Sequence, residues 1–275
     1  MTFEEFEKIT STMSSDGKFS FGENWTDFVE NRVTENIIQS HLDNLKTYYN
    51  NLENSSVIDI GCGSGLSSLC FNILGSYRIE SIDIDPNSVK ATVLLTKKFP
   101  HKINTNCDWK VYTDSILNNS LIEKLQGSFD IVYSWGVLHH TGNMWQSIKN
   151  AVKLVKPGGI LHLALYVSGS RFSSDLKMKI MYNMSDEKEK KKMIYQWLNQ
   201  LYISKGVDIF SYNARGMNKY NDCIDWLGGF PYEVCDEDIL TSYLINLNFE
   251  RIFFKSTGEG GNFIVLYRKK YEETN

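Results

Sequence analysis

The sequence predicts an α/β fold with a parallel sheet at its centre, and three features of the chain indicate it. Residues 57–60 are a short β-branched run that enters a glycine-rich turn, and a helical pattern follows. Residues 129–166 read as strand, loop, helix, turn and strand, which is a βαβ unit with a right-handed crossover. Residues 236–269 read as a helix followed by two strands with a glycine-containing loop between them.

The glycine-rich turn is the most informative stretch. Glycines at positions 61, 63 and 65 let the backbone take positive φ and let a ligand approach without meeting a Cβ. The helical pattern beyond them runs from Leu66 to a stop at Gly75, and its first N–H groups favour an anionic group. Asp59 lies two positions before Gly61, where it would repel a pyrophosphate and attract a ligand that carries an ammonium and a sulfonium.

The string D-x-G-C-G-S-G in residues 59–65 resembles motif I of the class I S-adenosyl-L-methionine-dependent methyltransferases. The order FDIV, GVLHHT and VKPGG in residues 129–159 resembles the region that follows motif I, with Val155 where leucine is commoner. This resemblance implies a Rossmann-like sheet of seven strands with the seventh antiparallel, and S-adenosylmethionine as the cofactor, released as S-adenosylhomocysteine. It covers residues 52–167 and, in topology, residues 236–269.

The resemblance also implies which residues bind the cofactor. The methionine end is expected at the glycine turn, on Asp59, Gly61, Gly63, Ser64 and Gly65.

A second strand, residues 78–85, is expected to bring Asp83 to the ribose hydroxyl groups, with Ile84 against the adenine. Asp85 precedes Pro86 and is expected to cap the next helix instead.

Two further strand ends complete the expected cofactor site. The third strand, residues 109–114, ends in an acid, and the resemblance implies that Asp114 and Ser115 contact the adenine amino group, with a surface turn as the alternative. Ser134, at the end of the fourth strand, is the last expected cofactor contact.

Two adjacent histidines, His139 and His140, lie in the loop after the fourth strand, where ligands bind in open α/β sheets. A neutral imidazole can accept a proton from a hydroxyl group near neutral pH. Adjacent loop residues diverge, so we expect one of the two to be the general base, without choosing between them. The alternative is a structural pair that bonds the backbone.

The remaining segments are expected to enclose the acceptor. We expect an N-terminal cap in residues 1–50, a core in 51–167, an inserted helical lid in 168–235 and a closing helix and hairpin in 236–275. In the cap, one helical pattern runs from Phe28 to Leu45. The predicted substrate-binding residues are polar or aromatic: Trp25, Arg215, Tyr220, Asp222, Asp225, Trp226 and Glu233. The alternative is an ordered lid whose polar groups satisfy its own backbone.

Composition limits the partners. The net charge of −4 with interspersed signs argues against a nucleic-acid partner. The five cysteines form no C-x-x-C pair, no metal site is expected, and no stretch approaches the ~20 apolar residues of a membrane span. We therefore expect a cytoplasmic protein with a small-molecule substrate, no membrane partner and a possible homodimer.

The sequence thus predicts methyl transfer to a hydroxyl group of a small metabolite. FGENW and DWLGGFPYE resemble methyltransferases of sugar and surface-polysaccharide pathways, so a sugar or nucleotide-linked sugar is the expected acceptor. The alternatives are an amine or phosphoryl-linked acceptor, or a non-catalytic protein that binds S-adenosylmethionine.

Overall fold

The structure is a computed structural model and describes residues 1–11, 21–211, 218–258 and 260–271. Its contacts divide the chain into two compact units. The sheet unit comprises Phe21–Phe172 and Glu233–Asn275. The helical unit comprises Met1–Ser20 and Ser173–Tyr232.

The sheet unit contains one seven-stranded sheet with the order β3-β2-β1-β4-β5-β7-β6. Strands β1 to β5 pair in parallel, and β7 runs antiparallel to both β5 and β6. The strand bounds are β1 Ser56–Ile60, β2 Arg78–Asp83, β3 Asp108–Thr113, β4 Phe129–Trp135, β5 Val155–Tyr166, β6 Phe249–Ser256 and β7 Asn262–Lys269. The predicted seven-stranded sheet with an antiparallel seventh strand is confirmed.

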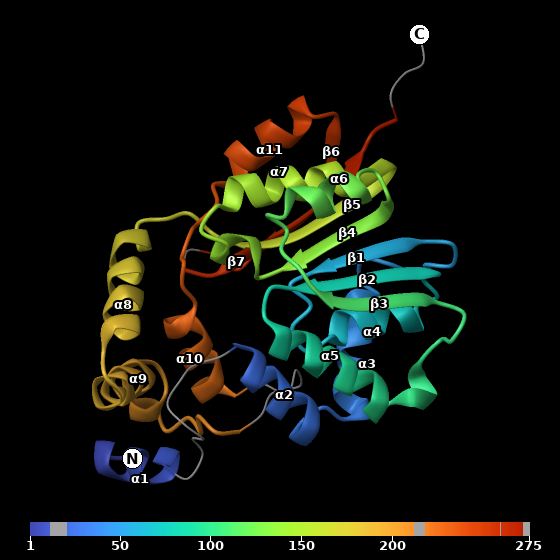
Figure 1. The fold of residues 1–275 in the computed structure, drawn as a ribbon. Helices are drawn as coiled ribbons and strands as arrows, with labels where there is room; N and C mark the ends of the chain where they lie inside the picture. Colours follow the sequence, from blue (N-terminus) through green and yellow to red (C-terminus); the bar gives the residue numbers. More distant parts are fainter. Residues whose placement is uncertain (12–20, 212–217, 259, 272–275) are drawn as a thin grey trace. The chain divides into compact units, whose positions relative to one another are not determined.

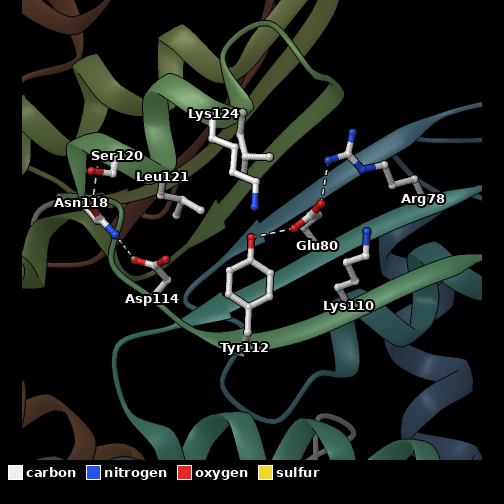
Figure 2. A pocket seen from close by; sticks show the side chains of 10 residues that line it. Arg78, Glu80, Lys110, Tyr112, Asp114, Asn118, Ser120, Leu121 and Lys124 are labelled. Carbon is white, nitrogen blue, oxygen red and sulfur yellow. Dashed lines mark hydrogen bonds and ion pairs between the residues drawn. The ribbon is translucent and has the colours of Figure 1, made fainter.

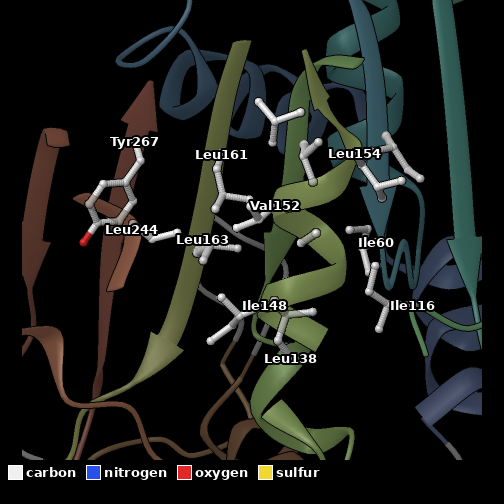
Figure 3. Packing of buried hydrophobic residues seen from close by; sticks show 14 of the residues in the cluster. Ile60, Ile116, Leu138, Ile148, Val152, Leu154, Leu161, Leu163, Leu244 and Tyr267 are labelled. Carbon is white, nitrogen blue, oxygen red and sulfur yellow. The ribbon is translucent and has the colours of Figure 1, made fainter. Parts of the chain in front are cut away.

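Helices cover both faces of this sheet (Figure 1), with α3, α4 and α5 on one side and α6, α7 and α11 on the other. The bounds in this unit are α2 Phe21–Asn31, α3 Glu35–Leu45, α4 Leu66–Ile73, α5 Pro86–Lys98, η1 Pro100–Lys102, α6 Asn119–Leu125, η2 Leu138–His140, α7 Met144–Leu154 and α11 Glu237–Asn246. On the face covered by α6, α7 and α11, buried side chains such as Leu138, Ile148 and Leu244 pack in one cluster with Leu161 and Leu163 of β5 (Figure 3). This packing fixes the strand ends from which the site is built.

Three local predictions in this unit need correction. The single helical pattern through residues 28–45 is two helices, because Thr34 begins α3 by accepting the N–H of Ile37. Residues 156–159 were expected as a turn before the fifth strand, but they belong to β5, which begins at Val155. Trp145 is 38 % exposed and does not share the buried side of α7 with Ile148.

The helical unit packs around its own apolar cluster. Its helices are α1 Phe3–Ser11, α8 Phe172–Met184, α9 Glu187–Leu201, η3 Ile203–Lys205 and α10 Lys219–Gly228. The first residue of α8, Phe172, is the last residue of the first segment of the sheet unit. Phe6, Ile194 and Leu198 are among the buried members of the cluster. Asp186 caps α9 by accepting the N–H of Glu189. Within the described ranges, no helix is long and apolar enough to cross a membrane.

Candidate active site

The glycine turn connects β1 to α4 and is shaped for a close approach. Gly61, Gly63 and Gly65 take φ values of 75°, 54° and 80°, a region that residues with a Cβ rarely adopt. The N–H of Gly61 donates to the carbonyl of Ile82 at 2.8 Å, which ties the turn to β2. Side chains also surround the turn, since a Cβ on Gly65 would lie 2.7 Å from Thr92. Both the backbone conformation and the space therefore require glycine.

Trp25 of α2 lies against this turn. A Cβ added to Gly63 would come within 3.0 Å of the Trp25 indole nitrogen. The indole also meets the ring of Phe28 edge-on at 5.8 Å, which supports it from within α2. Trp25, which was predicted to bind substrate, thus lies on a helix beside the glycine turn.

Asp83 and Asp114 lie at neighbouring strand ends. One Asp83 carboxylate oxygen accepts the N–H of Gly63 at 3.0 Å, and the other accepts the N–H of Asp85 at 2.9 Å. Burial raises the pKa of Asp83, and these two donors oppose the rise. The backbone N–H of Asp114 donates to the Asp83 carbonyl at 3.0 Å, which fixes the distance between the two ends. Asp85 caps α5 through the N–H of Asn87, as predicted.

The other residues expected to bind the cofactor differ in how exposed their side chains are and in which hydrogen bonds they already make. Ile84 is 75 % exposed beside Asp83, so its side chain is free to contact a flat apolar group. Ser115 accepts the N–H of Leu117 through its hydroxyl oxygen, and Ser64 is buried in the turn. Ser134 is buried and donates to the carbonyl of Ile60 at 3.2 Å, so its hydroxyl hydrogen joins β4 to β1.

Asp59 lies beneath the glycine turn rather than in it. Its side chain is 2 % exposed, and its carboxylate accepts the hydroxyl of Ser68 at 2.5 Å. Burial raises the pKa of Asp59 to about 7, while the Ser68 donors oppose the rise and Asp83 adds to it. The charge of this carboxylate is therefore sensitive to its hydrogen bonds near neutral pH.

A groove of about 590 Å³ begins at Asp114 and runs along the face of β2 and β3 (Figure 2). Its central carboxylate, Glu80, is bonded to Arg78 and to the Tyr112 hydroxyl, each at 2.6 Å. Lys110 at its rim pairs with Asp108 at 2.9 Å. Arg78, Glu80 and Lys110 are thus each bonded to a group of opposite charge, so they contribute little net charge to attract a ligand.

The histidine loop follows β4, at the same carboxyl edge of the sheet as the glycine turn. His139 is 1 % exposed, and its ring lies 4.0 Å from that of Tyr166, the last residue of β5. The backbone N–H of Tyr166 donates to Nδ1 of His139 at 3.3 Å. His140 is partly exposed, and its ring meets Tyr166 edge-on at 5.4 Å. The two histidines therefore have different surroundings.

Glu233, predicted to bind substrate, has partners within the sheet unit. Its carboxylate accepts the N–H of Met144 at 3.0 Å, at the first residue of α7. Its own N–H donates to the carbonyl of His139 at 3.0 Å. Glu233 thus links the histidine loop to the start of α7, where a negative charge complements the helix dipole.

The remaining predicted substrate-binding residues lie on α10 of the helical unit or outside the described ranges. Trp226 stacks on Trp197 at 5.7 Å, and Tyr220 packs against Phe6 at 5.9 Å, so both contribute to the packing of that unit. Asp222 and Asp225 are partly exposed on the same helix.

Arg215 falls among residues 212–217, outside the described part of the chain. The described residues include no group of three or more His, Cys, Asp or Glu side chains placed to hold a metal ion.

Sequence reasoning missed Tyr166, which contacts both histidines. Its signal was its place at the carboxyl end of β5, next to the strand that carries the histidine loop. Adjacent parallel strands bring such ends together. Ser68 was missed because its partner, Asp59, is reached only when α4 folds back on β1.

The central part of the chain matches a known protein family. Residues 58–161, which run from β1 into β5, match the family described as a methyltransferase domain. This segment is fewer than half of the 275 residues of the chain. It contains the glycine turn, Asp83, Asp114 and both histidines.

Curated relatives that match include ubiquinone biosynthesis O-methyltransferases. The protein from Rickettsia prowazekii (strain Madrid E) is 27 % identical over 158 residues, which are 57 % of this chain and 55 % of that protein. The mitochondrial protein from Dictyostelium discoideum is 32 % identical over 115 residues, 41 % of this chain and 36 % of that protein. The chain thus spans about half, or less, of the length of these relatives.

A solved structure with a similar fold is the magnesium protoporphyrin IX methyltransferase from Synechocystis PCC 6803 with bound SAH. The likeness covers 96 % of this chain and 94 % of that one, with a TM-score of 0.51 and 14 % identity. It concerns the fold.

The residues of this segment fit S-adenosylmethionine as a cofactor. Its turn has positive-φ glycines at 61, 63 and 65 with no room for a Cβ at Gly65, and a carboxylate lies directly beneath. Asp83 and the exposed Ile84 follow on the next strand, where ribose and adenine would be bound. These are the group types that a cationic nucleoside needs.

Proposed function

We propose that the protein is an S-adenosylmethionine-dependent methyltransferase that transfers a methyl group to a hydroxyl oxygen of a small acceptor. The observation that carries this proposal is the position of His140. It is partly exposed at the carboxyl end of β4, in the same unit and at the same sheet edge as the glycine turn. A proton acceptor at that edge is what O-methylation requires of the protein.

The chain's own residues would divide the work as follows. The glycine turn holds the methionine end, Asp83 the ribose and Asp114 the adenine amino group. When bound, S-adenosylmethionine supplies a methyl group made electrophilic by its sulfonium. His140 accepts the proton of the acceptor hydroxyl, and Trp25 helps to exclude water beside the turn.

The choice of His140 over His139 follows from a hydrogen bond. A backbone N–H can only donate, so Nδ1 of His139 is the acceptor from Tyr166 and carries no proton. In the neutral ring of His139 the proton is therefore on Nε2, which makes that nitrogen a donor. His139 is also almost fully buried, whereas His140 is reached by solvent. We therefore assign the base to His140 and a supporting role to His139.

A phenolic hydroxyl is the acceptor we favour. Ubiquinone carries a quinone ring, so the relatives named for its biosynthesis support an acceptor hydroxyl on an aromatic ring. The aromatic side chain of Tyr166, next to both histidines, suits the stacking of such a ring. A sugar or nucleotide-linked sugar, expected from the two short sequence resemblances, is the second acceptor class.

The test is a methyl-transfer assay with the full chain. Purified protein and S-adenosylmethionine are incubated with catechols and other phenols or with sugar nucleotides, and S-adenosylhomocysteine and methylated product are measured. His140→Ala is expected to reduce kcat by about 100-fold or more with little change in cofactor affinity. His101→Ala is the matched control, because His101 is exposed and pairs with Glu35. It should retain full activity.

The outcomes separate the alternatives. Product only from sugar nucleotides would replace the phenolic assignment with the sugar assignment. Product with an unchanged rate in His140→Ala, and a large loss in His139→Ala, would overturn the choice of base. Saturable cofactor binding without transfer to any phenol, sugar or amine would favour the non-catalytic alternative.

A further inference from the structure

A chain of buried hydrogen bonds connects the third strand of the sheet to the carboxylate beneath the glycine turn. The Trp109 indole nitrogen lies 2.8 Å from the Ser81 hydroxyl, and the Ser81 and Ser68 hydroxyl oxygens are 2.6 Å apart. The Ser68 hydroxyl reaches Asp59 at 2.5 Å. We call these residues the donor chain: Trp109 of β3, Ser81 of β2, Ser68 of α4 and Asp59 of β1.

The register of the sheet explains why these groups meet. Asp59 pairs with Ser81 across β1 and β2, so the two side chains stand on the same face of the sheet. That face is the one covered by α4, which supplies Ser68. Ser68 and Ser81 are fully buried. Water therefore does not compete for the bond between the two serines, whereas the Trp109 indole is partly exposed.

The direction of each bond can be assigned. An indole N–H only donates, so Ser81 accepts from Trp109. An ionised carboxylate only accepts, so the Ser68 hydrogen points to Asp59. The hydrogen between the two serines then belongs to Ser81, and Ser68 accepts it. All three hydrogens point toward the carboxylate, and each donor polarises the next.

We propose that the donor chain keeps the Asp59 carboxylate ionised beneath the glycine turn, and that Trp109 is thereby a positioning residue for the cofactor. A negative charge there favours the cationic methionine end of S-adenosylmethionine. The proposal rests on the proposed function, because it concerns the same cofactor site. Trp109 lies on the edge strand β3, and its indole N–H donates to Ser81 rather than to the glycine turn.

The backbone N–H of Ser68 also favours the ionised form of Asp59, by less than the Ser68 hydroxyl does, whereas the remaining groups that face Asp59 do not. Asp83 at the end of β2 adds a negative charge, and burial raises the pKa of both Cys62 in the turn and Tyr133 on β4, so both stay neutral. Asp59 forms no ion pair with any residue that the structure describes. The donor chain is therefore the main protein source of stabilisation for the ionised form.

The experiment compares the full chain with Trp109→Phe and Ser81→Ala. Trp109→Phe retains an aromatic ring and removes the N–H, whereas Ser81→Ala breaks the chain at its centre. Trp145→Phe is the matched control, since Trp145 lies on α7 and contacts Tyr243 instead. Calorimetry gives the dissociation constant of S-adenosylmethionine between pH 5.5 and 8.5. In parallel, carbon NMR of labelled aspartate without cofactor follows the Asp59 carboxyl, identified by its loss in Asp59→Asn.

The expected result is an upward shift of the Asp59 titration midpoint by about half a unit in Trp109→Phe and about one unit in Ser81→Ala. Cofactor binding near pH 7 should weaken by about 2-fold and about 5-fold respectively, with little change at pH 8.5. Trp145→Phe should match the wild type.

Unshifted midpoints in both variants would overturn the proposal. Equal weakening of binding at every pH would also overturn it, because a purely structural role has that effect. Failure of the wild type to bind S-adenosylmethionine would overturn the proposed function, while the NMR titration would still decide on the donor chain.

Discussion

Replacing Gly61 by alanine would place a methyl group where Val137 already packs. A Cβ built on Gly61 would overlap both methyl groups of Val137 and lie 2.9 Å from its Cβ. Rotation about χ1 of Val137 moves its methyl groups but not its Cβ, so the clash cannot be fully relieved that way. Gly61 also has a φ of 75°, which is unfavourable for a residue with a Cβ. Two separate costs therefore act at one position.

The size of the effect follows from these two costs. The left-handed backbone costs about 1–2 kcal/mol. Overpacking against a neighbour that cannot move away costs about 1–3 kcal/mol. We expect Gly61→Ala to lower the free energy of unfolding by about 2–5 kcal/mol in total. In Gly61→Ala with Val137→Ala, much of the overpacking disappears, so the two changes should couple favourably by about 1–3 kcal/mol.

Urea unfolding of the wild type, both single variants and the double variant measures this coupling. Gly136→Ala is the control for the backbone cost alone, because Gly136 has a φ of 76° and an added Cβ would meet nothing within 4 Å. It should lose about 1–2 kcal/mol. Additivity of the two changes within about 0.5 kcal/mol would refute the steric argument. A loss in Gly61→Ala no larger than that in Gly136→Ala would refute it as well.

Three further outcomes follow from other parts of the structure. Glu233→Gln removes the charge that accepts the N–H of Met144, and urea unfolding should show a loss of about 1 kcal/mol; an unchanged value would contradict this cap. Lys179 is buried in the helical unit and donates to the carbonyls of Trp226 and Gly229, so Lys179→Met should cost about 2 kcal/mol in thermal unfolding; equal stability would argue against that role. The pKa of Asp59 is raised to about 7, against about 3.9 in the unfolded chain, so its protonation contributes stability that is complete below pH 4 and is lost as pH rises to 7. Relative to Asp59→Asn, the wild type should lose about 4 kcal/mol over that range; a difference that is independent of pH would disprove the shift.

Several elements could be predicted because their signals are local. The hairpin strands β6 and β7 have the predicted bounds, since alternation and a glycine-containing loop specify a hairpin. Asp85 caps its helix as expected, because a cap bonds an N–H two or three residues away. The break before α3 had a local signal of the same kind in Thr34, which the longer apolar pattern obscured.

Predictions that depended on which side chains meet were less complete. Trp226 and Tyr220 have the composition of a sugar site, yet both contribute to packing within the helical unit. Glu233 was expected to bind substrate, and it bonds the start of α7. In each case the residue type suits either role, and only its neighbours in the fold distinguish the two.

The sequence by itself indicated the strands, the glycine turn and the edge at which the histidines lie, because strand ends and turns follow from short-range patterns, and the family resemblance implied the seven-stranded sheet. Only the tertiary structure distinguished His139 from His140, through the N–H of Tyr166, which lies 27 residues away from His139. Only the tertiary structure joined Trp109 to Asp59, through hydroxyl groups on two other elements. The physical reason is that the proton position on an imidazole and the charge of a buried carboxylate depend on the donors that surround them, and those donors come from distant parts of the chain.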